Sequence, residues 1–213
     1  MPDSLRFNVP IGSYSRFRVT TPCGLAGRGS VIGVPDQPES FYNNGRVDAG
    51  LLWFHSGFVE YVVSNALPRN ACVTRLEVIA ELCSEAPGYC DEWPSDITVS
   101  INGIEIGTWT SPGDFGGRRG RFTPQYWSLL DTQYGLLKRW SVTPDAACID
   151  DIPIAPVRIG QLALETGDVI AIRFEVRPNA RNVGGLNLFG ASFGDYGQDM
   201  AISLEYDIGA ESI

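Results

Sequence analysis

The stretch that decides the fold is Asp96-Ile97-Thr98-Val99-Ser100-Ile101-Asn102-Gly103-Ile104-Glu105-Ile106-Gly107-Thr108-Trp109. Apolar and polar residues alternate on both sides of its central Asn-Gly pair, which is typical of two strands that each bury one face. Asn102 and Gly103 are residue types that adopt a positive φ readily, as a type I′ turn requires at both central positions. The sequence therefore predicts a β-hairpin over residues 96–109.

The same period of two residues recurs along the chain between glycine- and proline-rich turns. Ile170, Ile172, Phe174 and Val176, for example, share one face of a predicted strand. Further strands are expected at residues 16–20, 51–63, 75–85, 136–143, 185–190 and 202–208. Short strands at regular spacing predict an all-β fold, and strands near both ends of the chain suit a jelly roll. We therefore expect a single antiparallel β-sandwich domain of jelly-roll type over residues 1–213.

Only one segment carries a convincing helix start. Thr123 can serve as an N-cap and Pro124 suits the first helical turn, so we expect one short loop helix over residues 123–130. The glycine-rich residues 113–117 lack the preceding strand and following helix of a phosphate-binding loop. They are interpreted as a turn.

Composition excludes several classes of partner. The chain has 16 basic and 25 acidic residues, a net charge of −9, so we expect binding neither to nucleic acid nor to anionic membranes. Hydrophobic residues make up 44% of the chain, enough for a core. No apolar run approaches the roughly 20 residues that a membrane-spanning helix needs.

The rare residues restrict the chemistry further. His55 is the single histidine of the sequence, which argues against histidine-rich metal sites and leaves one candidate base for a catalytic triad. Lys138 stands alone beside 15 arginines, so one Schiff-base lysine would be available. We expect structural roles for both.

The cysteines indicate the redox environment. They are Cys23, Cys72, Cys83, Cys90 and Cys148. An odd number, no Cys-x-x-Cys motif and no signal-peptide pattern at the start predict reduced thiols and a cytoplasmic protein. A disulfide between Cys83 and Cys90 is the less favoured alternative.

Two unusual segments, residues 85–96 and 109–121, flank the hairpin. Because a hairpin returns the chain to the end where it began, these segments should meet at one rim of the sandwich. Residues 126–134 form the next loop. The candidate ligand-binding residues on this rim are Tyr89, Trp93, Asp96, Trp109, Arg118, Arg119, Tyr126, Trp127 and Gln133.

Aromatic rings beside carboxylates and guanidinium groups are what a carbohydrate needs. Trp93 and Trp109 would stack on the C–H face of a sugar ring. Glu85, Asp96 and Asp114 would accept hydrogen bonds from its hydroxyl groups. The sequence therefore predicts a small-molecule site, most simply for a carbohydrate or a related polar metabolite.

Two ionic features of the rim leave alternatives open. Arg118 and Arg119 could hold an anionic group of the ligand, or form a solvated turn paired with aspartates. Asp91, Asp96 and Asp114 offer hard oxygen ligands for calcium. No D-x-D-x-D-G loop is present, so no metal or other cofactor is predicted and calcium is the less favoured alternative.

Three other interpretations of the rim are alternatives to a binding site. The catalytic reading is a carbohydrate-active enzyme that uses Glu85 and Asp114 as its two carboxyl groups. In the structural reading, tryptophan and proline simply plug the open end of the sandwich. In the third reading the chain is an assembly subunit or homo-oligomer with a large interface.

A set of short motifs runs along nearly the whole chain. They are Cys23-Gly24-Leu25-Ala26, Leu52-Trp53-Phe54, Ser84-Glu85-Ala86-Pro87-Gly88, Trp93-Pro94-Ser95-Asp96-Ile97, Asn102-Gly103, residues 107–116, Gln133-Tyr134-Gly135-Leu136-Leu137-Lys138, Val183-Gly184-Gly185-Leu186-Asn187 and Gln198-Asp199. Over about residues 6–206 the chain resembles a bacterial β-domain that is fused C-terminally to ArsR-type winged-helix transcriptional regulators. The resemblance implies an effector-sensing or ligand-binding domain without a known reaction.

The sequence departs from that family at its start. The first strand-like run begins within the first 20 residues, which leaves no room for a winged helix, so DNA binding is not expected. Glu81-Leu82-Cys83 is similar to the metal-sensing motif of ArsR repressors, but Ser84 stands where that motif needs a second cysteine. Metal sensing is not expected either.

Overall fold

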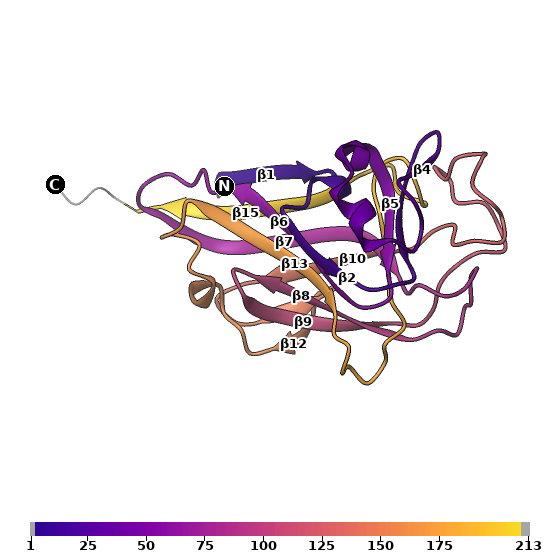
Figure 1. Ribbon diagram of the computed structural model, residues 1–213. Helices are drawn as coiled ribbons and strands as arrows, with labels where there is room; N and C mark the ends of the chain where they lie inside the picture. The colour runs from indigo at the N-terminus through magenta and orange to yellow at the C-terminus, as the bar shows by residue number, and fades with distance from the viewer. Residues whose placement is uncertain (1–2, 210–213) are drawn as a thin grey trace.

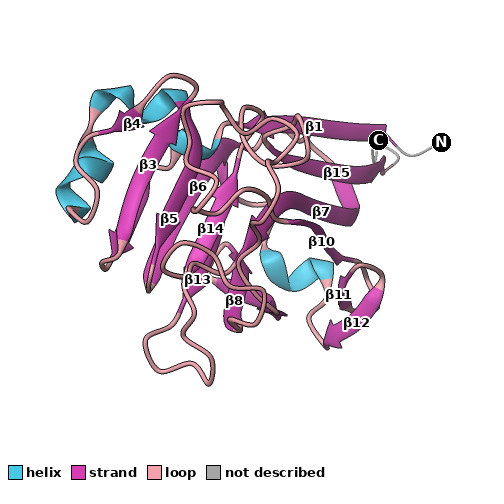
Figure 2. Ribbon diagram, turned by 90° about the vertical axis from the view of Figure 1, so that its right-hand side faces the viewer, coloured by secondary structure: helices cyan, strands magenta, loops and turns pink. Residues whose placement is uncertain are grey.

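Two antiparallel sheets face each other in the computed structural model, which describes residues 3–209 (Figures 1 and 2). One sheet has ten strands and the other has five. The predicted all-β sandwich is confirmed. Among the described residues, no helix is long and apolar enough to cross a membrane.

The ten-stranded sheet is organised around one long central strand. Its order is β12 (Ile152–Ala155), β11 (Ala147–Ile149), β10 (Leu136–Val142), β7 (Ala71–Cys83), β14 (Leu186–Phe189), β5 (Ala49–Phe54), β3 (Cys23–Gly27) and β4 (Val31–Ile32). Strand β7 has 13 residues, so beside β14 it also pairs with β15 (Met200–Ile208). Strand β15 in turn pairs with β1 (Asp3–Val9), which the sequence did not predict, so strands from both ends of the described chain are neighbours.

The five-stranded sheet contains the hairpin on which the fold prediction rests. Its order is β2 (Arg16–Val19), β6 (Gly57–Ser64), β13 (Val169–Val176), β8 (Ser95–Ile101) and β9 (Ile104–Ser111). Asn102 and Gly103 join β8 to β9 with φ of 49° and 81°, the signs of a type I′ turn. The Asn102 side chain accepts from Ala171 N at 2.9 Å and donates to Leu162 O at 2.9 Å, which ties the turn to its surroundings.

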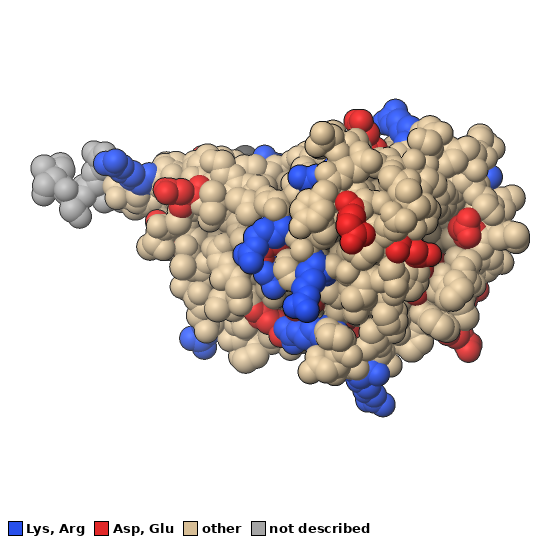
Figure 3. Space-filling model, in the orientation of Figure 1, with Lys and Arg blue, Asp and Glu red and all other residues tan. Residues whose placement is uncertain are grey.

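The main core lies between the two sheets, where the period of two residues places the apolar side chains. The predicted face of β13 is completely buried there, with Ile170, Ile172, Phe174 and Val176. The outer face of the five-stranded sheet is charged instead. Glu60 lies between Arg16 at 3.3 Å and Arg173 at 2.7 Å, and basic side chains gather on this face (Figure 3).

A second, smaller core covers the outer face of the ten-stranded sheet. Leu51 on β5 and Cys83 on β7 pack there with Ala26, Phe189 and Phe193. Because side chains alternate along a strand, Leu51 and Trp53 face these covering loops while Leu52 and Phe54 face the main core. Figure 2 shows loops crossing in front of β14 and β7.

The predicted helix over residues 123–130 is wrong, because this segment forms turns. An N-cap hydroxyl must accept from a nearby backbone N–H. The Thr123 hydroxyl instead donates to Gln133 O at 2.6 Å and accepts from Gly194 N at 3.1 Å. The short helices of the fold are 3₁₀ turns elsewhere: η1 (Ile11–Ser13), η2 (Pro38–Tyr42), η3 (Asn44–Asp48) and η4 (Ile159–Leu162).

The predicted strands are otherwise present, with one division. Residues 51–63 form the pair β5 and β6, separated by a turn at His55 and Ser56. All five cysteines are free thiols, and the Cys83–Cys90 alternative is not formed. Buried Cys83 directs its thiol toward Ser84 O at 3.2 Å.

Candidate functional site

The three rim loops meet as the sequence predicts. The β7–β8 loop pairs with the segment after β9 through Cys90 N to Asp114 O at 3.0 Å and Asp114 N to Cys90 O at 2.8 Å. The third loop joins them, because Gln133 N donates to Phe115 O at 2.8 Å. Together they cover the outer face of the ten-stranded sheet near the ends of β7 and β14.

A cleft of about 460 Å³ opens where these loops meet the sheet. It draws on segments that are far apart in the sequence. Its principal lining residues are Pro22, Pro35, Asp36, Trp53, Glu85, Ala86, Asp114, Trp127, Asp131, Thr132 and Asn187.

Trp53 owes its position in the cleft to the glycine beside it. Gly24 on β3 is the register partner of Trp53 on β5, and a Cβ at position 24 would lie 2.6 Å from Trp53 Cη2. The benzene ring of Trp53 therefore occupies the space that a side chain at position 24 would fill. Trp127 packs edge-on against Trp53 at 5.8 Å between ring centroids, and its Nε1 donates to Thr132 O at 2.8 Å. The two indoles form a fixed aromatic wall.

Asp114 is a buried carboxyl group held by several donors. Its Oδ2 accepts from Ala86 N at 3.0 Å and from Asn187 Nδ2 at 3.2 Å. Asn187 is itself oriented by a second bond, to Ser84 O at 2.6 Å. Burial raises the pKa of Asp114 to about 6, against the opposing effect of these hydrogen bonds.

Glu85 differs from Asp114 in having no donor on its carboxyl group among the described residues. Glu85 as a whole residue is only 9% exposed, and it lines the cleft. Burial raises the pKa of Glu85 to about 7, and the charges of Asp114 and Asp36 act in the same direction. At neutral pH this carboxyl group can therefore both donate and accept hydrogen bonds.

The cleft is acidic as well as aromatic. Asp36 accepts from Cys23 N at 3.0 Å, and burial raises the pKa of Asp131. Among the described residues that line the cleft there is no lysine, arginine or histidine. Four carboxyl groups without a basic partner disfavour an anionic ligand.

Of the predicted site residues, the structure brings Glu85, Asp114 and Trp127 together in this cleft. Asp96 and Trp109 lie away from it, on β8 and β9. Asp96 accepts from Thr110 Oγ1 at 2.8 Å and from Asn182, which lowers the pKa of its carboxyl group against the effect of burial. Trp109 packs against the main core, with Lys138 Nζ 5.1 Å from its ring centroid.

Arg118 and Arg119 are engaged within the protein, and Arg118 follows the predicted alternative of a turn paired with an aspartate. Arg118 forms an ion pair with Asp195 at 2.5 Å and lies 3.7 Å from the ring centroid of Tyr134. Arg119 donates to Pro124 O at 2.6 Å and to Trp127 O at 3.1 Å. Arg119 thus supports the loop that carries Trp127.

The remaining predicted residues do not line the cleft. Tyr89 covers Gly116, and Trp93 is 38% exposed. Gln133 is buried, and its Nε2 donates to Ser128 O at 2.7 Å and Asp131 O at 2.9 Å, so it shapes the loop. Tyr126 donates through its hydroxyl to Gly27 O at 2.6 Å.

The predicted calcium ligands are not brought together. Asp114 is bound by Ala86 and Asn187, while Asp96 is bound in the five-stranded sheet. Within residues 3–209, no group of three or more His, Cys, Asp or Glu side chains is arranged to hold a metal ion.

Sequence reasoning missed Trp53 and Asn187, which β5 and β14 contribute to the cleft. Trp53 lies in the wholly apolar run Leu51-Leu52-Trp53-Phe54, where no polar residue reveals which face it occupies. Asn187 is the one polar residue of β14, and this was a usable signal. A buried polar side chain in an apolar strand needs a partner.

No family model matches the chain, and no curated protein matches its sequence. Among solved structures, it is similar to the CBM36-1 domain of a multidomain xylanase from the hindgut metagenome of Trinervitermes trinervoides. That match has 8% identity, covers 99% of this chain and 100% of the domain, and has a TM-score of 0.38.

Two larger proteins match with similar scores. A Paenibacillus sp. cycloisomaltooligosaccharide glucanotransferase complexed with cycloisomaltoheptaose is 8% identical over 94% of this chain and 18% of its own, with a TM-score of 0.37. The catalytic domain of a GH87 α-1,3-glucanase in complex with tetrasaccharides is 12% identical over 100% of this chain and 30% of its own, with a TM-score of 0.35. These likenesses are too distant to transfer a function.

Proposed function

We propose that this protein binds a neutral carbohydrate in the cleft between Trp53 and Glu85. The observation that carries the proposal is the aromatic wall. Trp53 is held in place by Gly24 on one side and Trp127 on another, and its remaining surface lines a cleft that also contains a partner-free carboxyl group. Indole surfaces bind the C–H faces of sugar rings, and carboxyl groups bind their hydroxyls.

The rest of the lining suits a small polar ligand. The volume of about 460 Å³ lies within the range of roughly 300–1,000 Å³ for ligand pockets. Proline and alanine supply apolar walls, while Glu85, Asp114 and Asn187 supply a few convergent polar groups. Because Asp114 and Asn187 are fixed by their own hydrogen bonds, Glu85 is the side chain free to adjust to a hydroxyl group.

The acidic lining favours neutral sugars over uronates and sugar phosphates. Asp36, Asp131 and Asp114 would each repel a second negative charge, and Arg118 and Arg119 are committed elsewhere. The sequence left open a ligand with an anionic group. The acidic lining narrows the expected ligands to neutral sugars.

Thermal unfolding in the presence of sugars tests the proposal. The panel contains glucose, galactose, mannose, xylose and their oligosaccharides, with glucuronate and glucose 6-phosphate as anionic counterparts. A ligand at a hundredfold excess over Kd adds about 2.7 kcal/mol to the free energy of unfolding. We expect at least one neutral sugar to raise the midpoint and the anionic compounds to leave it unchanged.

Two variants assign the effect to the cleft. Trp53→Ala should abolish the stabilisation by sugar. Trp93→Ala is the matched control, because Trp93 is an exposed tryptophan on a neighbouring loop outside the cleft. An unchanged response in Trp53→Ala, or a panel without any hit, would overturn the proposal.

A second candidate function is a carbohydrate-active enzyme, favoured by Glu85 and its pKa of about 7 beside the second carboxyl group of Asp114. Glycoside hydrolysis uses an acid with a raised pKa together with a second carboxylate. However, Asp114 is 1% exposed and its Oδ2 already accepts two hydrogen bonds, which makes it a poor nucleophile. Binding is therefore the better-supported function.

Product analysis distinguishes the two candidates. An enzyme would convert the bound sugar, and Glu85→Gln would abolish turnover while binding persists. If the wild-type protein binds the sugar and releases it unchanged, the enzyme is excluded for that sugar.

We also propose that the protein works in the cytoplasm. Five free thiols suit a reducing compartment such as the cytoplasm. There a sugar-binding cleft would serve effector sensing, as the resemblance to the ArsR-associated domain implies. The test is to purify the native protein and look for a DNA-binding protein bound to it. The sugar that fills the cleft should release that partner.

A further inference from the structure

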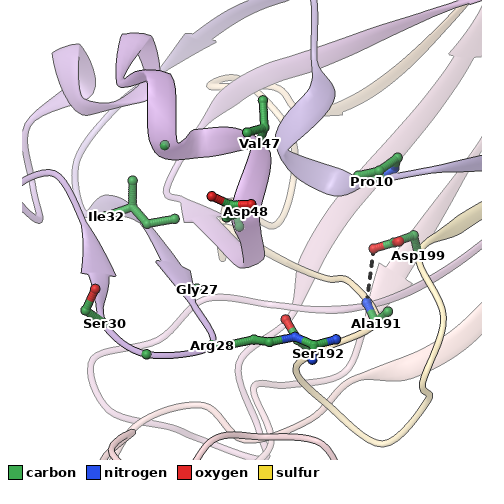
Figure 4. A pocket seen from close by; sticks show the side chains of 13 residues that line it. Pro10, Gly27, Arg28, Ser30, Ile32, Val47, Asp48, Ala191, Ser192 and Asp199 are labelled. Atoms are coloured by element: carbon green, nitrogen blue, oxygen red, sulfur yellow. Dashed lines mark hydrogen bonds between the residues drawn. The ribbon is translucent and has the colours of Figure 1, made fainter.

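A second cleft, of about 570 Å³, lies at the start of β5. Its walls come from the β3–β4 turn, the end of η3 and the loop after β14 (Figure 4). Gly27, Arg28, Asp48 and Ser192 are among its lining residues. The proposed sugar site at Trp53 does not include this second cleft.

Strand β5 connects the two clefts. Gly50 forms a bulge in β5 opposite Ala26 and Gly27, and a Cβ at position 50 would lie 3.3 Å from the Cβ of Ser192 in the second cleft. Ala49 lines the second cleft and Trp53 lines the first. They are four residues apart, or about 13 Å at 3.3 Å per residue. Leu51 lies between them and is completely buried in the smaller core, so a ligand that reaches both clefts has to pass over the side chains covering Leu51.

Tyr126 lies across this passage. Its hydroxyl donates to the carbonyl of Gly27, a residue of the second cleft, while the adjacent Trp127 lines the first. The Tyr126 ring packs edge-on against Trp127 at 6.2 Å and remains 41% exposed. The exposed ring of Tyr126 therefore lies between the two clefts. Its hydroxyl is held by Gly27, and its ring packs against Trp127.

We propose that the second cleft is a subsite for the same carbohydrate, so that the protein binds an oligosaccharide running from Trp53 over Tyr126 to Asp48. This inference rests on the proposed function of the Trp53 cleft. The ligand class becomes a neutral oligosaccharide rather than a single sugar. Tyr126 supplies the stacking surface for the middle of the chain.

The polar groups of the second cleft fit hydroxyl recognition. Asp199 is already engaged, since it accepts from Asn8 Nδ2 at 3.2 Å and from Ala191 N at 3.1 Å. Asp48, Arg28 and Ser192 all line this cleft (Figure 4). Asp48 and Arg28 are exposed, and Ser192 is half-buried. A carboxylate, a guanidinium group and a hydroxyl together can accept from and donate to sugar hydroxyl groups.

The test is the dependence of affinity on chain length, measured by calorimetry with the cello-, xylo-, malto- and laminari-oligosaccharide series. We expect the wild-type protein to bind a hexasaccharide at least about tenfold more tightly than the disaccharide of the same series, or about 1.4 kcal/mol. Gly29→Trp blocks the second cleft. Gly29 lines it, and a Cβ at this position meets open space.

Gly160→Trp is the matched control, because its Cβ also meets open space and it lines a different pocket near η4. Gly29→Trp should lower hexasaccharide affinity to the disaccharide level and leave disaccharide affinity unchanged. Tyr126→Ala should also lower hexasaccharide affinity to the disaccharide level. Tyr126→Phe keeps the ring, so it should retain most of the dependence of affinity on oligosaccharide length.

The outcomes separate the two proposals. If no sugar of any length binds, the proposed function itself fails. If disaccharide and hexasaccharide bind equally well, or if Gly29→Trp leaves the length dependence intact, the second subsite is overturned while the Trp53 site stands.

Discussion

Trp53 and Gly24 are register partners on neighbouring strands, and the indole ring of one fills the space above the other. A Cβ on Gly24 would lie 2.6 Å from Trp53 Cη2 and 2.8 Å from Cε2. Carbon atoms do not approach this closely, so any larger residue at position 24 has to displace the ring. The glycine therefore fixes the aromatic wall of the cleft without itself lining it.

Gly24→Ala should consequently weaken sugar binding. We expect a loss of about tenfold or more in affinity, because the displaced indole no longer lines the cleft, and a stability cost of about 1–3 kcal/mol from overpacking. Calorimetric titration with the sugar identified in the panel measures the first effect and urea denaturation the second. Gly160→Ala, at an unobstructed position, serves as the control. Wild-type affinity in Gly24→Ala would contradict the assigned role of Trp53.

The raised pKa of Glu85 predicts how stability depends on pH. Between its usual 4.5 and about 7, the folded protein retains a proton that the unfolded chain has released. The free energy of unfolding should therefore fall as pH rises through this interval and level off above it. The contribution of Glu85 is on the order of 3 kcal/mol, since one pKa unit corresponds to about 1.4 kcal/mol.

Glu85→Gln removes this titration. The variant should be more stable than the wild type at pH 8, with a flatter dependence of the free energy of unfolding on pH. Urea denaturation at several pH values checks this, with Glu92→Gln on the exposed part of the same loop as control. Parallel pH profiles for Glu85→Gln and wild type would show that Glu85 does not retain its proton.

Glu81 holds the covering loops onto the sheet. Its buried carboxyl group accepts from Gly135 N at 2.9 Å, Asp195 N at 2.8 Å and Tyr196 N at 3.0 Å. Glu81→Ala leaves three backbone N–H groups without this acceptor, and an unsatisfied buried donor costs about 1–3 kcal/mol. We expect a lower free energy of unfolding and faster amide hydrogen exchange at residues 133–135 and 194–196. Exchange unchanged at both segments would disprove the anchoring role.

Asp114→Ala should lower the free energy of unfolding by removing hydrogen bonds beneath the cleft. It leaves Ala86 N–H and the Asn187 amide without their acceptor, at about 1–3 kcal/mol for each buried donor. The measurement is urea denaturation beside Asp91→Ala, an exposed aspartate of the facing loop. Equal stability of the two variants would mean that the hydrogen bonds of Asp114 do not support the structure.

The hairpin prediction extended correctly to part of the site. Once residues 96–109 form a hairpin, the segments before and after it must leave from adjacent strand ends, and this places Glu85 near Asp114. The helix prediction at Thr123 failed for the opposite reason. A local capping preference was outweighed by hydrogen bonds to Gln133, which lies outside the predicted helix, and to Gly194, which is 71 residues away in sequence.

The sequence by itself determined the strands with clear alternation, the I′ turn at Asn102 and Gly103 and the acidic character of the chain, because alternation and turn preference act between neighbours. It did not reveal β1, β3, β4, β11 or β12. Only the tertiary structure decided the cleft. Trp53 and Asn187 meet Glu85 because β14 inserts between β7 and β5, and that pairing depends on contacts between segments more than 100 residues apart. No local pattern records such a pairing, since it is selected by how the whole sandwich buries its apolar faces.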